Sequence, residues 1–210
     1  EEWRRQGAWV SAAAGTPSRS FQFQHVLPHV TRAPKPQNAL ALKELRDWAA
    51  EDALDAIITN TANASTLVRV ARVKTPVIYF CHGLHWNGEP STSDRVFMGL
   101  EQAMLRNTAA IVCINDHDDN WFAEHAKDIP RLRLRYGVGL DTEVFRRREP
   151  KAWQASAGRP MRIVWVGEMS ERKNPFAMIE LANELNSRGI DFQIDMLGDG
   201  EFLEKMRQEA

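Results

Sequence analysis

Two histidines that follow a short apolar run are the first candidates for chemistry in this sequence. The run is Val77-Ile78-Tyr79-Phe80-Cys81, and it leads directly into His82, Gly83 and His85. Four β-favouring residues in succession predict a strand buried on both faces, as in parallel sheets that are covered by helices. Such sheets bind ligands outside the carboxyl ends of their strands, where His82 stands. The alternative is that both histidines are ordinary loop residues satisfied by backbone groups.

A pair of cations suggests a second candidate site. A buried strand is expected to end at Gly167, and Arg172 and Lys173 lie just before a helix that we expect to begin near Asn174. A lysine at a helix N-terminus, beside free backbone N–H groups, suits an anionic group such as a diphosphate. The alternative is a solvent-facing pair of cations in a loop.

The turn Gly198-Asp199-Gly200 follows another expected strand. It would let the backbone approach a ligand, or it is a plain turn between a strand and a helix. The sequence holds neither a Walker loop nor a complete Rossmann fingerprint. No Ser/His/Asp arrangement is legible, and the histidines lack partners at the spacing of a zinc site. The histidines by themselves therefore do not make a zinc site.

Composition places the chain among ordinary globular proteins. Of its 210 residues, 43% are apolar and 26% are charged, and the net charge is −1. This balance gives no global attraction for nucleic acid, so we expect no nucleic-acid partner. No apolar run is long enough to span a bilayer and no signal segment opens the chain, so the expected location is the cytoplasm. Cys81 and Cys113 lie in expected strands and are predicted to be free buried thiols.

The elements that position these residues alternate between strands and helices. Repeated βα units predict a doubly wound α/β domain with a mostly parallel sheet over residues 1–145. One of its helices, after Ser93, is expected to pack Val96, Phe97 and Leu100 inward and to carry Glu101 elsewhere. Residues 146–160 are rich in arginine and in helix-breaking residues, which is typical of a linker. Residues 161–210 read as the start of a second α/β domain.

In order and spacing, several stretches resemble family 4 glycosyltransferases of the GT-B fold, particularly the bacterial capsule and exopolysaccharide branch. The resemblance runs from about Arg32 to the end of the chain. It rests on Arg32-Ala33-Pro34 with Asn38, Tyr79 to Trp86, the Glu101 helix, Ile114-Asn115-Asp116, Gly137 to Phe145, Val166 to Asn174, and Leu197-Gly198-Asp199-Gly200.

The resemblance implies two Rossmann-like domains that face each other across a cleft, and transfer of a sugar from a nucleotide sugar with retention of configuration. It places His82 in the cleft as the catalytic candidate, where a positioned group could stabilise charge or orient a hydroxyl. On the acceptor side it implies Arg32, Gly83, His85 and Asn115. For the donor it implies Gly167, Arg172, Lys173, Gly198 and Gly200.

Two positions depart from the family pattern. Many relatives have arginine on the diphosphate where this chain has Glu168, so we assign no phosphate contact to Glu168. Relatives often have His-Thr-Pro where this chain has Asn60-Thr61-Ala62, which weakens any acceptor role at that place.

Whole elements of the family also fall outside these 210 residues. The first strand and its glycine-bearing loop are expected before Glu1, and the paired glutamates that grip the donor are expected beyond Ala210. These 210 residues therefore read as a fragment with little activity by itself. The resemblance also implies no metal ion, because GT-B transferases rely on helix termini and basic residues. Expected partners are a nucleotide sugar and a glycan or lipid-linked acceptor, with no separate cofactor and with room for peripheral association at the inner face of the plasma membrane. Two alternatives stay open: a relative that binds nucleotide sugar without transfer, and a nucleotide-sugar epimerase.

Overall fold

The computed structural model describes residues 2–18, 22–31, 35–86, 90–146 and 158–209. The chain divides into two compact units, Glu1–Asp141 and Thr142–Ala210, which are treated separately below. The predicted linker, 146–160, lies mainly outside the described residues.

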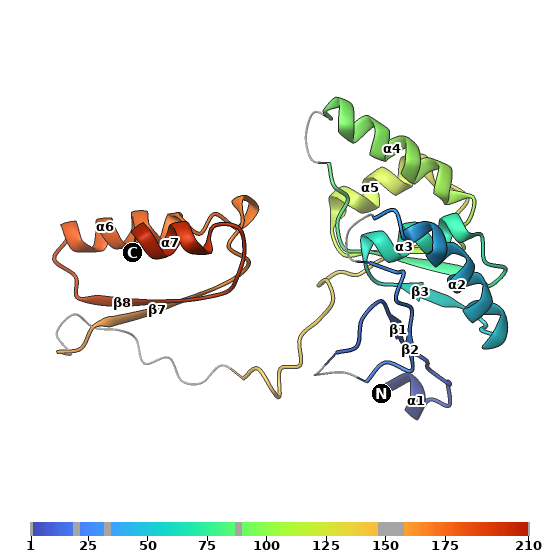
Figure 1. Ribbon diagram of the computed structural model, residues 1–210, viewed down its shortest axis with the longest axis horizontal. Coiled ribbons are helices and arrows are strands. Elements are labelled where there is room, and N and C mark those ends of the chain that lie inside the picture. The colour runs from blue at the N-terminus through green and yellow to red at the C-terminus, as the bar shows by residue number, and fades with distance from the viewer. Residues whose placement is uncertain (1, 19–21, 32–34, 87–89, 147–157, 210) are drawn as a thin grey trace. The chain divides into compact units, whose positions relative to one another are not determined.

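The first unit contains a four-stranded parallel sheet in the order β3-β4-β5-β6. Its strands and helices alternate along the chain, as Figure 1 shows. They are α2 (Asn38–Glu51), β3 (Ile57–Thr59), α3 (Ala62–Ala71), β4 (Val77–Cys81), α4 (Thr92–Leu105), β5 (Ala110–Cys113), α5 (Asp116–His125) and β6 (Arg131–Arg133). The prediction of a parallel α/β sheet is confirmed.

A short N-terminal part precedes this sheet. It consists of α1 (Glu2–Arg5) and a separate parallel pair of two-residue strands, β1 (Ala13–Ala14) and β2 (His25–Val26). Two histidines of this part lie near acidic residues of α2 and of its C-terminal end: His25 lies 2.9 Å from Asp52, and His29 lies 3.6 Å from Glu44. These contacts hold the N-terminal segment against α2.

The helical connections between the parallel strands explain why one face of the sheet is better covered than the other. Strands β3 to β6 follow one another in one direction, so right-handed crossovers put α3, α4 and α5 on the same face (Figure 1). On β4 the residues Val77, Tyr79 and Cys81 are buried, whereas Ile78 and Phe80 are only partly buried. The prediction of a strand buried on both faces therefore holds for one face of the described structure.

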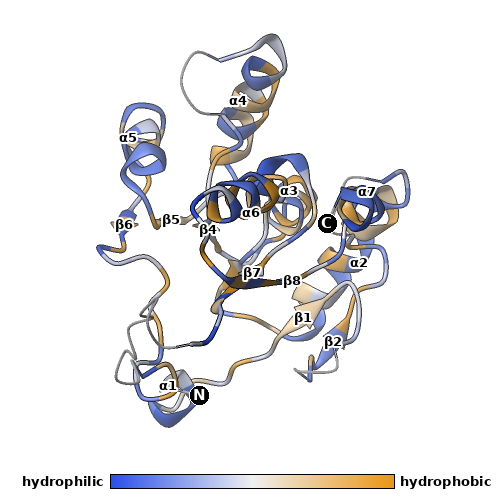
Figure 2. Ribbon diagram, turned by 90° about the vertical axis from the view of Figure 1, so that its left-hand side faces the viewer, coloured by the Kyte–Doolittle hydropathy of each residue, from blue (hydrophilic) through white to orange (hydrophobic). Residues whose placement is uncertain are grey.

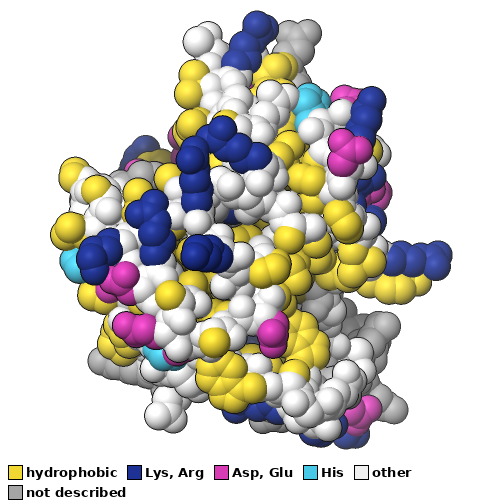
Figure 3. Space-filling view, turned by 90° about the vertical axis from the view of Figure 1, so that its right-hand side faces the viewer, with side chains coloured by type: hydrophobic (Ala, Val, Ile, Leu, Met, Phe, Trp, Pro, Cys, Tyr) yellow, Lys and Arg dark blue, Asp and Glu magenta, His cyan; other side chains and the backbone are white. Residues whose placement is uncertain are grey.

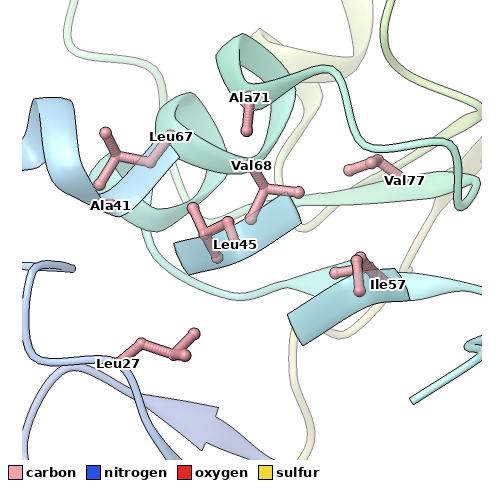
Figure 4. Packing of buried hydrophobic residues seen from close by; sticks show 9 residues of the cluster. Leu27, Ala41, Leu45, Ile57, Leu67, Val68, Ala71 and Val77 are labelled. Atoms are coloured by element: carbon pink, nitrogen blue, oxygen red, sulfur yellow. The ribbon is translucent and has the colours of Figure 1, made fainter. Parts of the chain in front are cut away.

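Two apolar clusters form the core of the first unit. The first joins α2 and α3 to the sheet and also includes Leu27, which follows β2 (Figure 4). Its members are Leu27, Ala41, Leu45, Ala49, Ile57, Leu67, Val68, Ala71 and Val77. The second lies nearer the carboxyl ends of β4 and β5: Tyr79, Cys81, Trp86, Leu105, Ile111, Cys113, Trp121, Phe122 and Ala126. Both cysteines are free and buried, as predicted.

Helix α4 is rotated relative to the prediction. Val96, Phe97 and Leu100, which were expected to pack inward, are 60%, 48% and 53% exposed, whereas Glu101 is buried. The reason is an ion pair, because the buried guanidinium of Arg69 on α3 binds the Glu101 carboxylate through two hydrogen bonds. Pairing makes burial of both charges tolerable and fixes which side of α4 faces α3.

The second unit has a parallel pair of strands, β7 (Met161–Val166) and β8 (Phe192–Leu197). Helices α6 (Ala177–Ser187) and α7 (Leu203–Glu209) both lie on one side of this pair (Figures 1 and 2). On β7 the residues Val164 and Val166 point away from them and are exposed. Figure 2 shows that both helices carry hydrophilic as well as hydrophobic residues, as expected for helices with one packed side.

The surface and the helices agree with the bulk composition. Figure 3 shows basic, acidic and hydrophobic side chains interspersed over one face, with both signs of charge represented. Among the described helices, none combines the length and the apolar character that a bilayer-crossing segment requires.

Candidate functional site

His82 lies directly after β4, at the carboxyl end of the sheet, and its side chain is exposed. Its Nε2 lies 2.6 Å from Oδ1 of Asn60, the residue that follows the neighbouring strand β3. Its ring stacks on Phe80 with the centroids 4.7 Å apart and the planes 16° from parallel. The imidazole is therefore oriented from two sides and keeps an open side toward solvent.

The backbone that carries His82 is held by a buried carboxylate from α5. Oδ1 of Asp118 accepts the backbone N–H of Leu84 at 3.2 Å, and Oδ2 accepts Sγ–H of Cys81 at 3.4 Å. Asp118 is 1% exposed. Since these contacts lie on either side of His82 and Gly83, they define the path of the turn. At Gly83 the backbone has φ +138°, a conformation in which a side chain is strained.

His85 and Trp86 form the far end of this loop. The ring of His85 is exposed and lies 5.9 Å from that of Phe97 on α4. Trp86 is buried and packs edge-on against Trp121 of α5, with the ring centroids 5.3 Å apart. Trp86 thus anchors the loop, while His82 and His85 both remain accessible to a ligand.

The other acceptor-side candidates differ in how far they can be described. Asn115 is the N-cap of α5: its Oδ1 accepts the N–H of Asp118 at 2.9 Å, and its Nδ2 donates to Oδ2 of Asp118 at 2.7 Å. Capping explains this residue locally. Arg32 lies outside the described residues, and its assignment stays a prediction.

In the second unit, the glycines let two loops pack against each other. Gly167 donates to the carbonyl of Leu197, and a Cβ on Gly198 would lie 1.8 Å from the carbonyl oxygen of Gly167. Gly200, at φ +149°, would place a Cβ 2.6 Å from the carbonyl oxygen of Met169. Close approach of two backbones therefore accounts for Gly198 and Gly200, and their contact with a donor stays a prediction.

The surroundings of Lys173 differ from the prediction in one respect. Helix α6 begins at Ala177 and not near Asn174; Lys173 ends a short 3-10 turn, Glu171–Lys173, and Asn174 follows with φ +44°. The N–H groups of the first three α6 residues donate to the carbonyls of Asn174, Pro175 and Phe176. The expected row of free N–H groups is thus absent at this helix start, because the preceding turn satisfies them.

The side chains near Lys173 still provide positive charge. Arg172 forms a loose, exposed ion pair with Glu168, with 3.8 Å between nitrogen and oxygen. Lys173 is exposed, and in the described part of the chain no acidic side chain lies within ion-pair distance of it. Glu168 thus pairs with a neighbouring cation, and Lys173 is available to an anionic ligand.

Sequence reasoning missed two residues of this arrangement. Asn60 was set aside because it departs from a family pattern, yet it contacts the His82 ring directly. Asp118 was not singled out, although it holds the loop. A signal existed for Asn60, because it is the first polar residue after a buried strand that neighbours β4 in the sheet.

Burial changes the acid–base behaviour of the residues beneath the site. Burial raises the pKa of the Cys81 thiol to about 12, with the nearby carboxylate of Asp118 adding to the rise. It raises the pKa of Tyr79 strongly as well, and the Arg69 guanidinium lies 4.1 Å over the Tyr79 ring. Neither group is suited to exchange protons near neutral pH.

The sequence of this chain is similar to that of known glycosyltransferases. Residues 1–137 match the family described as "Glycosyl transferase 4-like domain". Over 148 residues the chain is 27% identical to EpsF of Bacillus subtilis (strain 168), a protein named as an inferred glycosyltransferase; the match covers 68% of this chain and 38% of EpsF. The chain thus spans well under half the length of this curated relative.

Solved structures share the fold. TarM gives a TM-score of 0.57 at 11% identity, over 80% of this chain and 33% of TarM. Anabaena HepE in complex with UDP gives a TM-score of 0.52 at 15% identity, over 85% of this chain and 50% of HepE. UDP-N-acetylglucosamine 2-epimerase from Rickettsia bellii gives a TM-score of 0.52 at 9% identity, over 90% of this chain and 51% of the epimerase. At these identities the likeness concerns architecture alone.

Proposed function

Because this chain belongs to the family of glycosyl transferase 4-like domains, we propose that the protein is a retaining glycosyltransferase that moves a sugar from a nucleotide-sugar donor to a glycan acceptor. The observation that carries the proposal is the exposed His82 at the carboxyl end of β4, with its ring held by Asn60 and Phe80. An accessible but oriented side chain at this edge of a parallel sheet is the arrangement that ligand binding requires.

In this proposal the two units supply different contacts. Arg32, Gly83, His85 and Asn115 of the first unit lie on the acceptor side. In the second unit, Lys173 and Arg172 neutralise the donor diphosphate, with backbone of Gly167, Gly198 and Gly200 beside it. Positive charge placed where the diphosphate gains charge, as the bond to the sugar breaks, lowers the barrier to transfer.

The acceptor and the setting are also part of the proposal. The stretches that resemble glycosyltransferases of bacterial capsule and exopolysaccharide synthesis support a role in surface-polysaccharide assembly, with a lipid-linked glycan as acceptor. Such a reaction would place the protein in the cytoplasm, at the inner face of the plasma membrane, by peripheral association.

The test uses the full-length natural protein with a panel of nucleotide sugars and membrane glycolipids, and detects glycan product by mass spectrometry. His82→Ala should cost about 2 kcal/mol or more of transition-state stabilisation, a loss of about 30-fold in rate. His29→Ala, in the N-terminal segment beside α2, is the matched control and should retain the rate.

Each alternative predicts a different product. An epimerase would convert the donor sugar in the absence of acceptor, and a binding protein would bind nucleotide sugar and release no product. Unchanged transfer by His82→Ala would remove its catalytic assignment.

A further inference from the structure

Asn60 and His82 come together because their strands are neighbours in register. Strand β3 pairs with β4 so that Thr59 lies opposite Tyr79. The next residues, Asn60 and Phe80, therefore share one side of the sheet, and His82 follows Phe80 with the period of two that a strand gives. This side is opposite to that of the buried Tyr79, so the polar contact forms at the exposed surface.

The chemistry of the contact determines which nitrogen of His82 carries the proton. Oδ1 of Asn60 is an amide carbonyl oxygen and can only accept, so Nε2 of His82 must donate across the 2.6 Å. A neutral imidazole has a single N–H, so Nδ1 is then unprotonated and is an acceptor. No described residue hydrogen-bonds to Nδ1.

We propose that Asn60 is a positioning residue that holds His82 as its Nε2–H tautomer and directs Nδ1 toward a hydroxyl group of a sugar substrate. The inference rests on the proposed function. It chooses between the two roles open to His82, because a neutral ring with its one N–H bound to Asn60 has no donor left for a negative charge. It accepts a hydrogen bond from a hydroxyl and so orients that oxygen. The stacked Phe80 ring restricts rotation of the imidazole and supports the same geometry.

The first experiment reads the ring directly and does not depend on transfer. Long-range ¹H–¹⁵N spectra of the labelled 210-residue chain, recorded above neutral pH, should show His82 protonated at Nε2, with slow exchange of that proton. In Asn60→Ala the exchange with water should become at least tenfold faster and a second ring orientation should be populated. A wild-type ring protonated at Nδ1, or exchange unchanged in Asn60→Ala, would overturn the inference.

An isosteric variant sharpens this test. Among the described residues, no carboxylate lies within ion-pair distance of the His82 ring, so Asn60→Asp introduces the first one. It should raise the titration midpoint of His82, because a carboxylate favours the charged ring. Asn183→Asp, an equivalent change at an exposed position of α6, is the matched control. Equal midpoints in the two variants would contradict the contact.

The activity of the full-length protein separates the inference from the function on which it rests. Asn60→Ala should lower kcat several-fold with the donor KM little changed. Asn60→Asp should lose activity as the pH falls, because a protonated ring cannot accept at Nδ1, and should recover as the pH rises. If the spectra behave as stated but the wild-type protein forms no glycan product, the Asn60–His82 contact stands and the proposed function fails. If His82→Ala transfers sugar normally, the role of His82 in transfer fails. If His82→Ala is inactive but Asn60→Asp keeps the wild-type pH profile, the positioning role fails.

Discussion

The backbone N–H of Leu84 donates to Oδ1 of Asp118 at 3.2 Å, which joins the loop after β4 to the first turn of α5. The same carboxylate accepts from Cys81 and from the amide of Asn115, and Nδ1 of His117 lies 3.1 Å from its Oδ1. A single residue of α5 thereby fixes the loop that presents His82 and His85.

Replacing Asp118 with Ala should destabilise the first unit by about 2–3 kcal/mol, since buried donors lose their acceptor. Urea unfolding followed by tryptophan fluorescence would measure the change. Asp119→Ala is the control on the same helix, because Asp119 pairs with Arg131 at a partly exposed site and should cost about 1 kcal/mol or less. Equal costs for the two variants would mean that Asp118 does not hold the loop.

The ion pair between Arg69 and Glu101 predicts a non-additive pair of mutations. Both side chains are buried, at 1% and 7% exposure. Glu101→Gln should cost about 3–5 kcal/mol, because it leaves the guanidinium charged and unpaired in the interior. The double variant Arg69→Met/Glu101→Leu should recover much of that loss, since it removes both charges. Denaturant midpoints of the single variants Arg69→Met and Glu101→Leu and of the double variant would measure the coupling, and additive effects would contradict it.

The buried thiol of Cys81 predicts a loss of stability at alkaline pH. Burial raises its pKa to about 12, above the reference value of 9.0 for an unfolded thiol. Below pH 9 the thiol is protonated in both states and its contribution is fully present. Between pH 9 and 12 only the unfolded state releases the proton, so stability falls by up to about 1.4 kcal/mol per pH unit.

This behaviour can be measured by urea unfolding from pH 8 to 10.5. Cys81→Ala should reduce the slope of stability against pH. The remainder should reflect Cys113, whose pKa burial also raises to about 12, and at the alkaline end Tyr79, whose pKa burial raises as well. In the folded wild type at pH 8, both thiols should react slowly with a thiol reagent and should react fully once unfolded. Rapid labelling of the folded chain would contradict the burial.

We expect Lys173 to contribute to the affinity of the second unit for the donor diphosphate. Lys173→Met should weaken binding of nucleoside diphosphates by about 1.5–3 kcal/mol, the range for a hydrogen bond to a charged group. Isothermal titration calorimetry of the full-length protein with a panel of nucleoside diphosphates would measure this. Lys43→Met, at an exposed lysine of α2, removes the same charge elsewhere and should leave the affinity unchanged. Equal effects of both changes would mean that Lys173 acts only through the net charge of the protein and makes no direct contact with the diphosphate.

Local patterns in the sequence predicted the elements and the position of His82. A run of β-favouring residues that ends in a polar residue is sufficient to place His82 at the carboxyl end of a strand, because the strand and its end are marked by residues adjacent in sequence. The same is true of the helix that begins at Asn38 and of the buried free thiols.

The tertiary structure decided the contacts between residues that are distant in sequence. Asn60 reaches His82 across 22 positions through the register of β3 and β4. Glu101 is buried because Arg69, 32 positions away, supplies the opposite charge. The sequence predicts a helix start near Asn174, but a left-handed backbone there closes a 3-10 turn, and α6 begins at Ala177. In each case the deciding partner is set by strand pairing, charge pairing or loop packing in three dimensions, and a single linear pattern does not contain it.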